Sequence, residues 1–202
     1  MWNQLANEEI IQKTIKALGE NGITSEVVNT GEEAKNRVLE MIPTGVEVMN
    51  MQSQTLDKIG LTTEIMEGNK YISVKKTLMG MDRAKDGRKM QVIGAAPEYA
   101  VGSVHAVTEN GQVVVVSNTG SQLPAYAYGS DKVIWVVGTQ KIVANLDEAN
   151  KRIYEYVLEL ESERVRKANM MPKSNVSKML IISKEVRPKR LFLIFVREVL
   201  GF

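Results

Sequence analysis

Polar side chains that could bind a small molecule follow three apolar segments of this 202-residue chain. VEVMNM leads into QSQT, VVVVS into NTGSQ, and VIWVVG into TQK. If each apolar segment is a strand of an open α/β sheet, these loops lie at the carboxyl ends of strands, where ligands of such folds bind. The repetition predicts a shared pocket for a small anionic metabolite.

The three loops supply the side chains that such a pocket needs. Hydroxyls and an amide can donate and accept hydrogen bonds, a glycine lets the backbone approach a ligand, and a lysine can meet a carboxylate or phosphate. The alternative is ordinary capping of helix N-termini by serine and threonine, which involves no ligand. The candidate ligand-binding residues are Ser53, Thr119, Gly120, Ser121, Gln122 and Lys141.

An acid–base pair is the second candidate for chemistry. His105 is the only histidine, and its side chain alone has an unperturbed pKa close to neutrality. Glu109 follows it at the end of the same predicted strand, so the two could divide general acid and base roles. The alternative for His105 is a hydrogen-bonded position in or near the core.

Composition excludes several functional classes. The absence of cysteine rules out disulfides, thiol nucleophiles, zinc–thiolate sites and an iron–sulfur cluster held by this chain, and a single histidine rules out a multi-histidine metal site. A net charge of +2 and 5% aromatic residues give no basis for nucleic-acid binding. No Walker loop, GxGxxG, GxSxG or HExxH motif occurs, which excludes the commonest nucleotide-binding, serine-hydrolase and zinc-protease functions and leaves the cofactor unknown.

Periodicity predicts an alternation of helices and strands. Residues 103–108 and 112–117 read as two strands around an Asn110-Gly111 turn, and 132–138 as a strand buried on both faces. Residues 63–100 read as one or two helices. Two further strands close the chain, and Arg187, Lys189 and Arg190 in the turn between them would protect a sheet edge. Other helices are expected at 6–22, 31–42, 56–61, 123–129 and 146–167, and other strands at 23–28 and 46–51.

Length and segment composition predict one α/β domain over residues 1–202. The first residues lack the charged and apolar regions of a secretion signal, and no apolar run is long enough to cross a bilayer. We therefore expect a cytoplasmic protein without a membrane partner.

Residues 102–149, GSVHAVTENGQVVVVSNTGSQLPAYAYGSDKVIWVVGTQKIVANLDEA, resemble the central core of the LUD-domain family of bacterial lactate-utilisation proteins. Residues 179–202 resemble the family's closing hairpin, and residues 46–61 its strand followed by a serine-containing loop, where Ser53 matches. Glu109 with Gly111 resembles the family's Glu-Thr-Gly-Thr segment, although Asn110 and Gln112 replace its threonines.

The resemblance implies a three-layer α/β/α sandwich related to the sugar-phosphate isomerase and CoA-transferase folds, with a mostly parallel sheet, an antiparallel hairpin and a ligand site at the strand ends. It also implies an accessory role in organic-acid use of the lactate type, beside an iron–sulfur partner protein, and leaves a homo-oligomer open. The alternative is an isomerase or an acyl- or CoA-transferring enzyme with Glu109 or His105 as acid and base.

Overall fold

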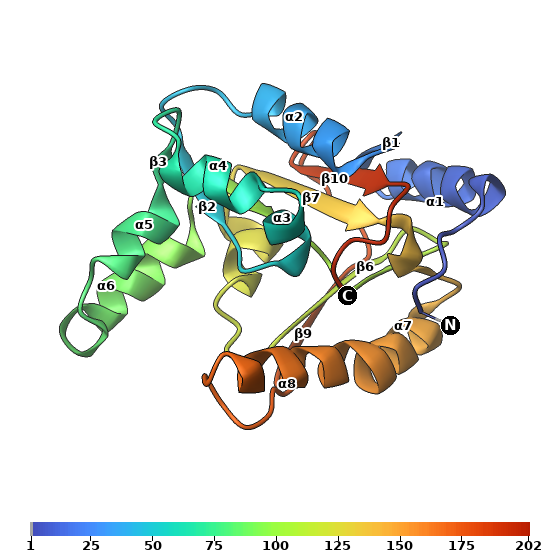
Figure 1. Cartoon of the computed structure of the whole chain (residues 1–202). Helices are drawn as coiled ribbons and strands as arrows, with labels where there is room; N and C mark the ends of the chain where they lie inside the picture. The colour runs from blue at the N-terminus through green and yellow to red at the C-terminus, as the bar shows by residue number, and fades with distance from the viewer. Residues whose placement is uncertain (1) are drawn as a thin grey trace.

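The computed structural model describes residues 2–202 and contains two β-sheets (Figure 1). The six-stranded sheet is parallel throughout, in the order β1-β10-β7-β4-β2-β3. The four-stranded sheet has the order β8-β5-β6-β9, with β6 antiparallel to both of its neighbours. The strands are β1 (Thr24–Val28), β2 (Glu47–Asn50), β3 (Ile72–Ser73), β4 (Tyr99–Gly102), β5 (Ala106–Thr108), β6 (Val113–Ser117), β7 (Lys132–Gly138), β8 (Ile142–Val143), β9 (Lys178–Ile182) and β10 (Leu191–Val196).

Helices cover the outer faces of the two sheets. The helical elements are α1 (Glu8–Glu20), α2 (Gly31–Met41), α3 (Gln54–Lys58), α4 (Leu61–Glu67), α5 (Val74–Met79), α6 (Arg83–Ala95), η1 (Ala125–Gly129), η2 (Thr139–Lys141), α7 (Leu146–Arg152), η3 (Ile153–Val157) and α8 (Leu158–Lys167). Side chains of α2, α3 and α4 pack on one face of the six-stranded sheet. Its other face packs against α1, η1 and the four-stranded sheet, whose outer face carries α7 and η3. None of the helices between residues 2 and 202 combines the length and the apolar character that a membrane crossing demands.

The central strand β7 shows why the six-stranded sheet is buried on both sides. Trp135 and Val137 point into the core shared with the four-stranded sheet, whereas Ile134 and Val136 point into the core under the helices. Alternate side chains of a strand face opposite sides, so a continuous apolar run fills both cores. The predicted fold class, an α/β protein with a mostly parallel sheet flanked by helices, is confirmed.

The predicted hairpin around Asn110 and Gly111 is present as β5 and β6. Gly111 has φ +80°, a conformation that favours glycine, and a Cβ there would lie 2.6 Å from the backbone carbon of Ala17. The amide of Asn21, at the end of α1, donates to the carbonyl oxygens of Asn110 and Gly111. The turn therefore holds the hairpin against α1.

Two expectations for strands are corrected by the structure. The closing segments form strands β9 and β10, but they belong to different sheets and make no hairpin with one another. Residues 63–100 contain β3 and β4 as well as the helices expected there. Both strands are short, two and four residues, and β4 includes an alanine and a glycine, which are weak signals for a strand.

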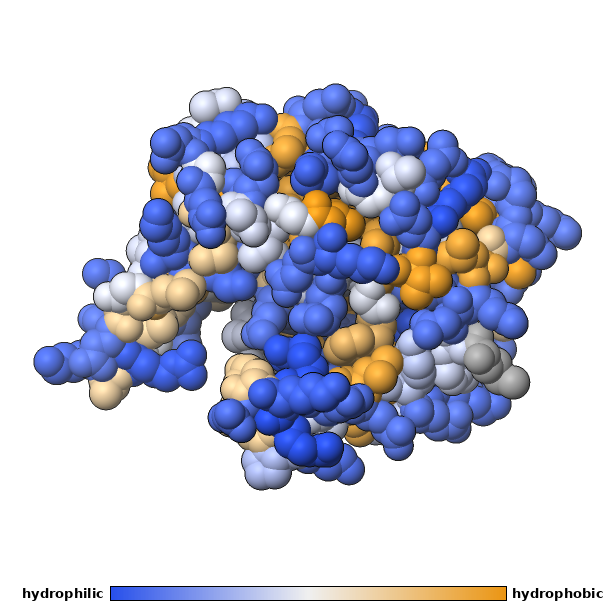
Figure 2. All heavy atoms as spheres, viewed as in Figure 1, coloured by the Kyte–Doolittle hydropathy of each residue, from blue (hydrophilic) through white to orange (hydrophobic). Residues whose placement is uncertain are grey.

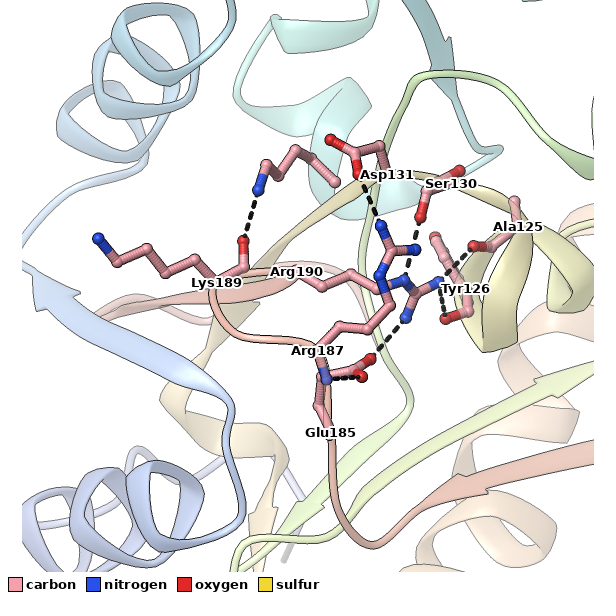
Figure 3. A network of polar contacts seen from close by, with 9 residues as sticks. Ala125, Tyr126, Ser130, Asp131, Glu185, Arg187, Lys189 and Arg190 are labelled. Atoms are coloured by element: carbon pink, nitrogen blue, oxygen red, sulfur yellow. Dashed lines mark hydrogen bonds and ion pairs between the residues drawn. The ribbon is translucent and has the colours of Figure 1, made fainter.

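Arg190 is buried, contrary to the expectation that it protects a sheet edge (Figure 3). Its guanidinium is 2.8 Å from the Glu185 carboxylate and donates to the carbonyl oxygens of Ala125, Tyr126 and Ser130. One side chain thus ties the segment before β10 to η1 and to the start of β7. The neighbouring Arg187 is half exposed and pairs with Asp131.

A glycine of η1 provides a test of this packing. A Cβ at Gly129 would lie 1.9 Å from the backbone oxygen of Ala95, which cannot move like a flexible side chain. We expect Gly129→Ala to lower the free energy of unfolding by ~1–3 kcal/mol. At Gly87, inside α6, a Cβ meets nothing within 4 Å, so Gly87→Ala should instead stabilise the protein by ~0.5–1 kcal/mol. Urea unfolding measures the free energy of unfolding of both variants, and equal changes in the two would contradict these predictions.

Helices α5 and α6 form an arm that projects from the body of the molecule (Figures 1 and 2). None of the thirteen residues of α6 is buried. The arm is attached at both ends, because Val74 of α5 is buried next to β3 and the end of α6 contacts η1 at Gly129.

Candidate functional site

A crevice between β2 and β4 is where this topology favours a ligand. From β2 the chain passes through α3 and α4 to β3, at the outer edge of the sheet. From β4 it passes through β5, β6 and η1 to β7, on the opposite side of β4. Neighbouring parallel strands whose connections leave in opposite directions open a crevice at their carboxyl ends.

A pocket of about 380 Å³ lies at these carboxyl ends. Its lining comes from the ends of β2 and β6, from the segments after β2, β4, β6 and β7, from α5, η3 and α8, from the loop before β9 and from the last residue of the chain. The polar and charged side chains of the lining are Asn50, Gln52, Ser53, Gln54, Thr55, Lys75, Ser103, His105, Ser117, Asn118, Thr119, Ser121, Gln122, Lys141, Glu161, Arg164, Ser174 and Asn175.

The structure brings together five of the six candidate ligand-binding residues. Ser53, Thr119, Ser121, Gln122 and Lys141 all line the pocket, although they come from three loops far apart in the sequence. Gly120 lies within the same loop but does not line the pocket. It has φ +84°, and a Cβ there would lie 2.4 Å from the side chain of Lys178. Its role is in the turn of the loop.

Some of these polar side chains already make hydrogen bonds within their own loops. Ser53 caps α3 through a 3.4 Å contact from the Leu56 N–H, and the Thr119 hydroxyl donates to Ser121. The Gln122 amide reaches the Val116 carbonyl oxygen at 3.4 Å. The capping alternative therefore applies to Ser53, while the loop after β6 is held mainly by its own side chains.

Lys141 lies at the floor of the pocket, where its side chain is 2% exposed. It follows the buried strand β7, so the fold carries its amine into the interior rather than to the surface. Its Nζ lies 3.3 Å from the Thr55 hydroxyl, 3.2 Å from the Ser103 hydroxyl and 3.1 Å from the Val104 carbonyl oxygen. Burial, and next the positive charge of Arg152, hold the pKa of Lys141 well below its ordinary value.

His105 also lines the pocket, but its ring is held in the neutral form. The Val116 N–H donates to His105 Nδ1 at 3.1 Å, which occupies the nitrogen lone pair. Burial, then the charges of Lys141 and Arg152, lower the pKa of His105 to about 3. The ring is therefore suited to hydrogen bonding and is not poised to exchange a proton near neutrality.

Glu109 lies outside the pocket. Its carboxylate is at the β5–β6 turn, 2.7 Å from Nζ of Lys13 on α1. The structure thus does not bring Glu109 to the site that contains His105. The isomerase or acyl-transfer alternative loses one of its two candidate groups at this pocket.

Sequence reasoning missed Asn50, Lys75, Arg152 and Arg164. Asn50 ends β2 and is fully buried, and neither its amide oxygen nor its amide nitrogen has a hydrogen-bond partner within residues 2–202. Its position as the polar residue at the end of an apolar strand was a usable signal. Lys75, on α5, lay in the segment whose structure the sequence left least defined.

The charge lining the pocket is positive. Glu161 is its one carboxylate among the described side chains, and this group accepts two 2.7 Å hydrogen bonds from Arg164. Lys75 and Lys141 have no ion-pair partner within 4 Å among residues 2–202, and Arg152 adds a buried charge behind the pocket wall. No cluster of three carboxylates or histidines that could hold a metal ion occurs across this range.

The fold and the pocket define an α/β protein with a polar site at the carboxyl ends of parallel strands. Residues 11–196 match the model of the LUD domain, and the chain belongs to this family. A solved structure of a DUF162 family protein from Deinococcus radiodurans is similar, with a TM-score of 0.59 at 14% identity over 96% of this chain and 99% of that one. This likeness shows a common fold.

Two other solved structures are similar over part of the chain. eIF2B beta from Chaetomium thermophilum gives a TM-score of 0.39 at 14% identity, over 57% of this chain and 43% of that one. Ribose 5-phosphate isomerase A from Neisseria gonorrhoeae gives a TM-score of 0.34 at 12% identity, over 68% of this chain and 64% of that one. No curated protein matches the sequence significantly.

Proposed function

We propose that the pocket binds a small organic anion. The observation that carries the proposal is the positive charge at a polar pocket: Lys75 lacks an ion-pair partner within residues 2–202, Arg152 is a buried cation that donates to the backbone of His105, and the carboxylate of Glu161 is already paired with Arg164. Cations without counter-charges are costly in a partly buried site, and an anionic ligand would offset that cost.

The remaining lining suits a ligand with hydroxyl or carbonyl groups as well as a charge. The amide of Asn50 offers a donor and an acceptor that are unused by the described residues, and Ser53, Thr119, Ser121 and Gln122 supply further polar groups at the rim. A hydroxy acid or a phosphorylated compound has this combination. Together with the family, it supports a role as an accessory protein of organic-acid use, beside an iron–sulfur protein that carries the redox centre.

A thermal-shift screen tests the anion site. Lactate, pyruvate, sugar phosphates and CoA esters are added to the purified protein, and a ligand that binds the folded state should raise the melting temperature in a concentration-dependent way. A neutral amide or alcohol of each compound should give no shift. If none of the anions raises the melting temperature, the proposal is wrong.

Adjacent lysines on α5 provide a matched pair of variants. Lys75 lines the pocket, whereas Lys76 is exposed and does not. We expect Lys75→Met to weaken the binding of an anion about tenfold, equivalent to ~1.4 kcal/mol, because one positive charge is lost from a partly buried site. Lys76→Met should leave the affinity within about twofold, because a solvated charge is screened. Calorimetric titration measures both, and equal losses would place the anion elsewhere.

A further inference from the structure

Lys141 has a chemical environment that differs from that of an ordinary charged lysine. Its Nζ is buried at the pocket floor, and all three of its polar contacts are to uncharged groups. Buried lysines are normally stabilised by a carboxylate. Glu161, the one side-chain carboxylate of the described lining, is held by the bidentate contact with Arg164.

The hydrogen bonds around Nζ can all be made by a neutral amine. The Thr55 hydroxyl donates to the Leu200 carbonyl oxygen at 3.1 Å, so its oxygen accepts from Lys141, as does the carbonyl oxygen of Val104. The Ser103 hydroxyl makes no other hydrogen bond within residues 2–202, so it can accept from an N–H of Lys141 or, when the amine is neutral, donate to the nitrogen lone pair. An amine has two N–H donors and one lone pair, and each then has a partner.

A buried positive group, Arg152, opposes protonation of the amine. Arg152, on α7, is fully buried and donates to the carbonyl oxygen of His105, whose ring lies on the pocket wall. Nε and Nη2 of Arg152 have no hydrogen-bond partner among the described residues, so its charge is poorly compensated. The lowered pKa of Lys141 agrees with this geometry. A lysine kept uncharged by burial and a neighbouring cation is a nucleophile for carbonyl groups.

We propose that the Lys141 amine forms an imine with the carbonyl group of a small organic acid. The nitrogen lone pair attacks the carbonyl carbon to give a carbinolamine, and loss of water then leaves a C=N bond. The carbonyl oxygen departs with the two hydrogens of the amine, so the step needs no oxidant or reductant. Ser103, which contacts the same nitrogen, is placed to donate to the carbinolamine oxygen.

This inference rests on the anion site of the proposed function and names its ligand class, a carbonyl-bearing acid. The carboxylate or phosphate of the ligand would be held by the positive charge of Lys75, and the carbonyl carbon would reach Lys141. Both lysines line the same pocket. A 2-hydroxy acid such as lactate would bind at the same place without forming a covalent bond.

Reductive trapping tests the imine. The protein is incubated with pyruvate, 2-oxoglutarate or dihydroxyacetone phosphate, then reduced with cyanoborohydride, digested and mapped by mass spectrometry. We expect at least one of the three to modify Lys141 about tenfold more than any other lysine, because burial lowers the pKa of Lys141 more than that of Lys75, the other lysine of the pocket. Because mass spectrometry compares Lys141 with the other lysines of the unaltered protein, the test does not depend on whether a variant folds. Lactate, which has no carbonyl group besides its carboxylate, should give no adduct.

Variants supply the control. Lys141→Met should lose the adduct and Lys76→Met should retain it, and thermal unfolding of each establishes that it is folded. No adduct with any of the three compounds, or adducts spread evenly over the exposed lysines, would overturn the inference. Thermal shifts with lactate and pyruvate but no adduct would leave the anion site standing and remove the imine. An adduct at Lys141 without any thermal shift would support the imine and count against the anion site.

Discussion

Replacing Arg190 with leucine should lower the free energy of unfolding by ~3–5 kcal/mol, because a largely buried carboxylate and several carbonyl groups lose their partner together. The side chain of Arg190 is 3% exposed and that of its partner Glu185 is 10% exposed. The same guanidinium serves the carbonyl oxygens of Ala125, Tyr126 and Ser130 (Figure 3). Urea unfolding measures the loss as a lower midpoint at an unchanged slope.

Arg187 provides the control for this result. Its ion pair with Asp131 is 2.9 Å long, but both side chains are more than half exposed, at 52% and 55%. Exposed pairs contribute little, so Arg187→Leu should cost ~0–1 kcal/mol. Similar losses of unfolding free energy in the two variants would show that burial does not determine how much Arg190 contributes to stability.

The second large effect is a fall in stability on mild acidification, which we attribute to His105. The pKa of His105 is about 3 in the folded protein against an ordinary value of 6.5. Between these two pH values the unfolded chain therefore binds a proton at His105 that the folded chain does not bind. Stability is therefore lost as the pH falls from 6.5 towards 3. The slope has an upper limit of ~1.4 kcal/mol per pH unit. We expect about half of this, because the ring is partly open to the pocket.

His105→Asn isolates this contribution. Asparagine can still accept from the Val116 N–H through its side-chain oxygen, but it does not titrate. Between about pH 7 and pH 5, above the range of the carboxylates, the unfolding free energy of the variant should change less with pH than that of the original protein. Urea midpoints at several pH values in this window provide the measurement. Parallel curves for the two proteins would assign the slope to groups other than His105.

Local sequence signals predicted most of the fold because they depend on neighbouring residues. The alternation in β7 and the Asn110-Gly111 turn act within a few positions, and both features are present in the structure. The strand-end loops also followed from sequence, since parallel strands place their carboxyl ends at one edge of a sheet. The convergence of Ser53, Thr119 and Lys141 on one pocket is consistent with this rule.

Features that depend on distant partners were not readable from the sequence. Arg190 stands in a turn-like RPKR segment, yet its partners Ala125 and Tyr126 lie 65 and 64 positions away. Glu109 has the spacing of a partner for His105, but it pairs with Lys13 on a helix 96 positions earlier. The separation of β9 and β10 into two sheets is likewise a property of strand order, which periodicity does not encode.

The arm formed by α5 and α6 has a practical consequence. The turn around Gly80 and Met81 joins the two helices, neither residue lines the pocket, and α6 contributes no buried side chain. Exposed tips of this kind accept inserted sequence with little effect on folding. A short peptide tag or a fluorophore attached there would report on the protein while leaving both sheets and the ligand crevice intact.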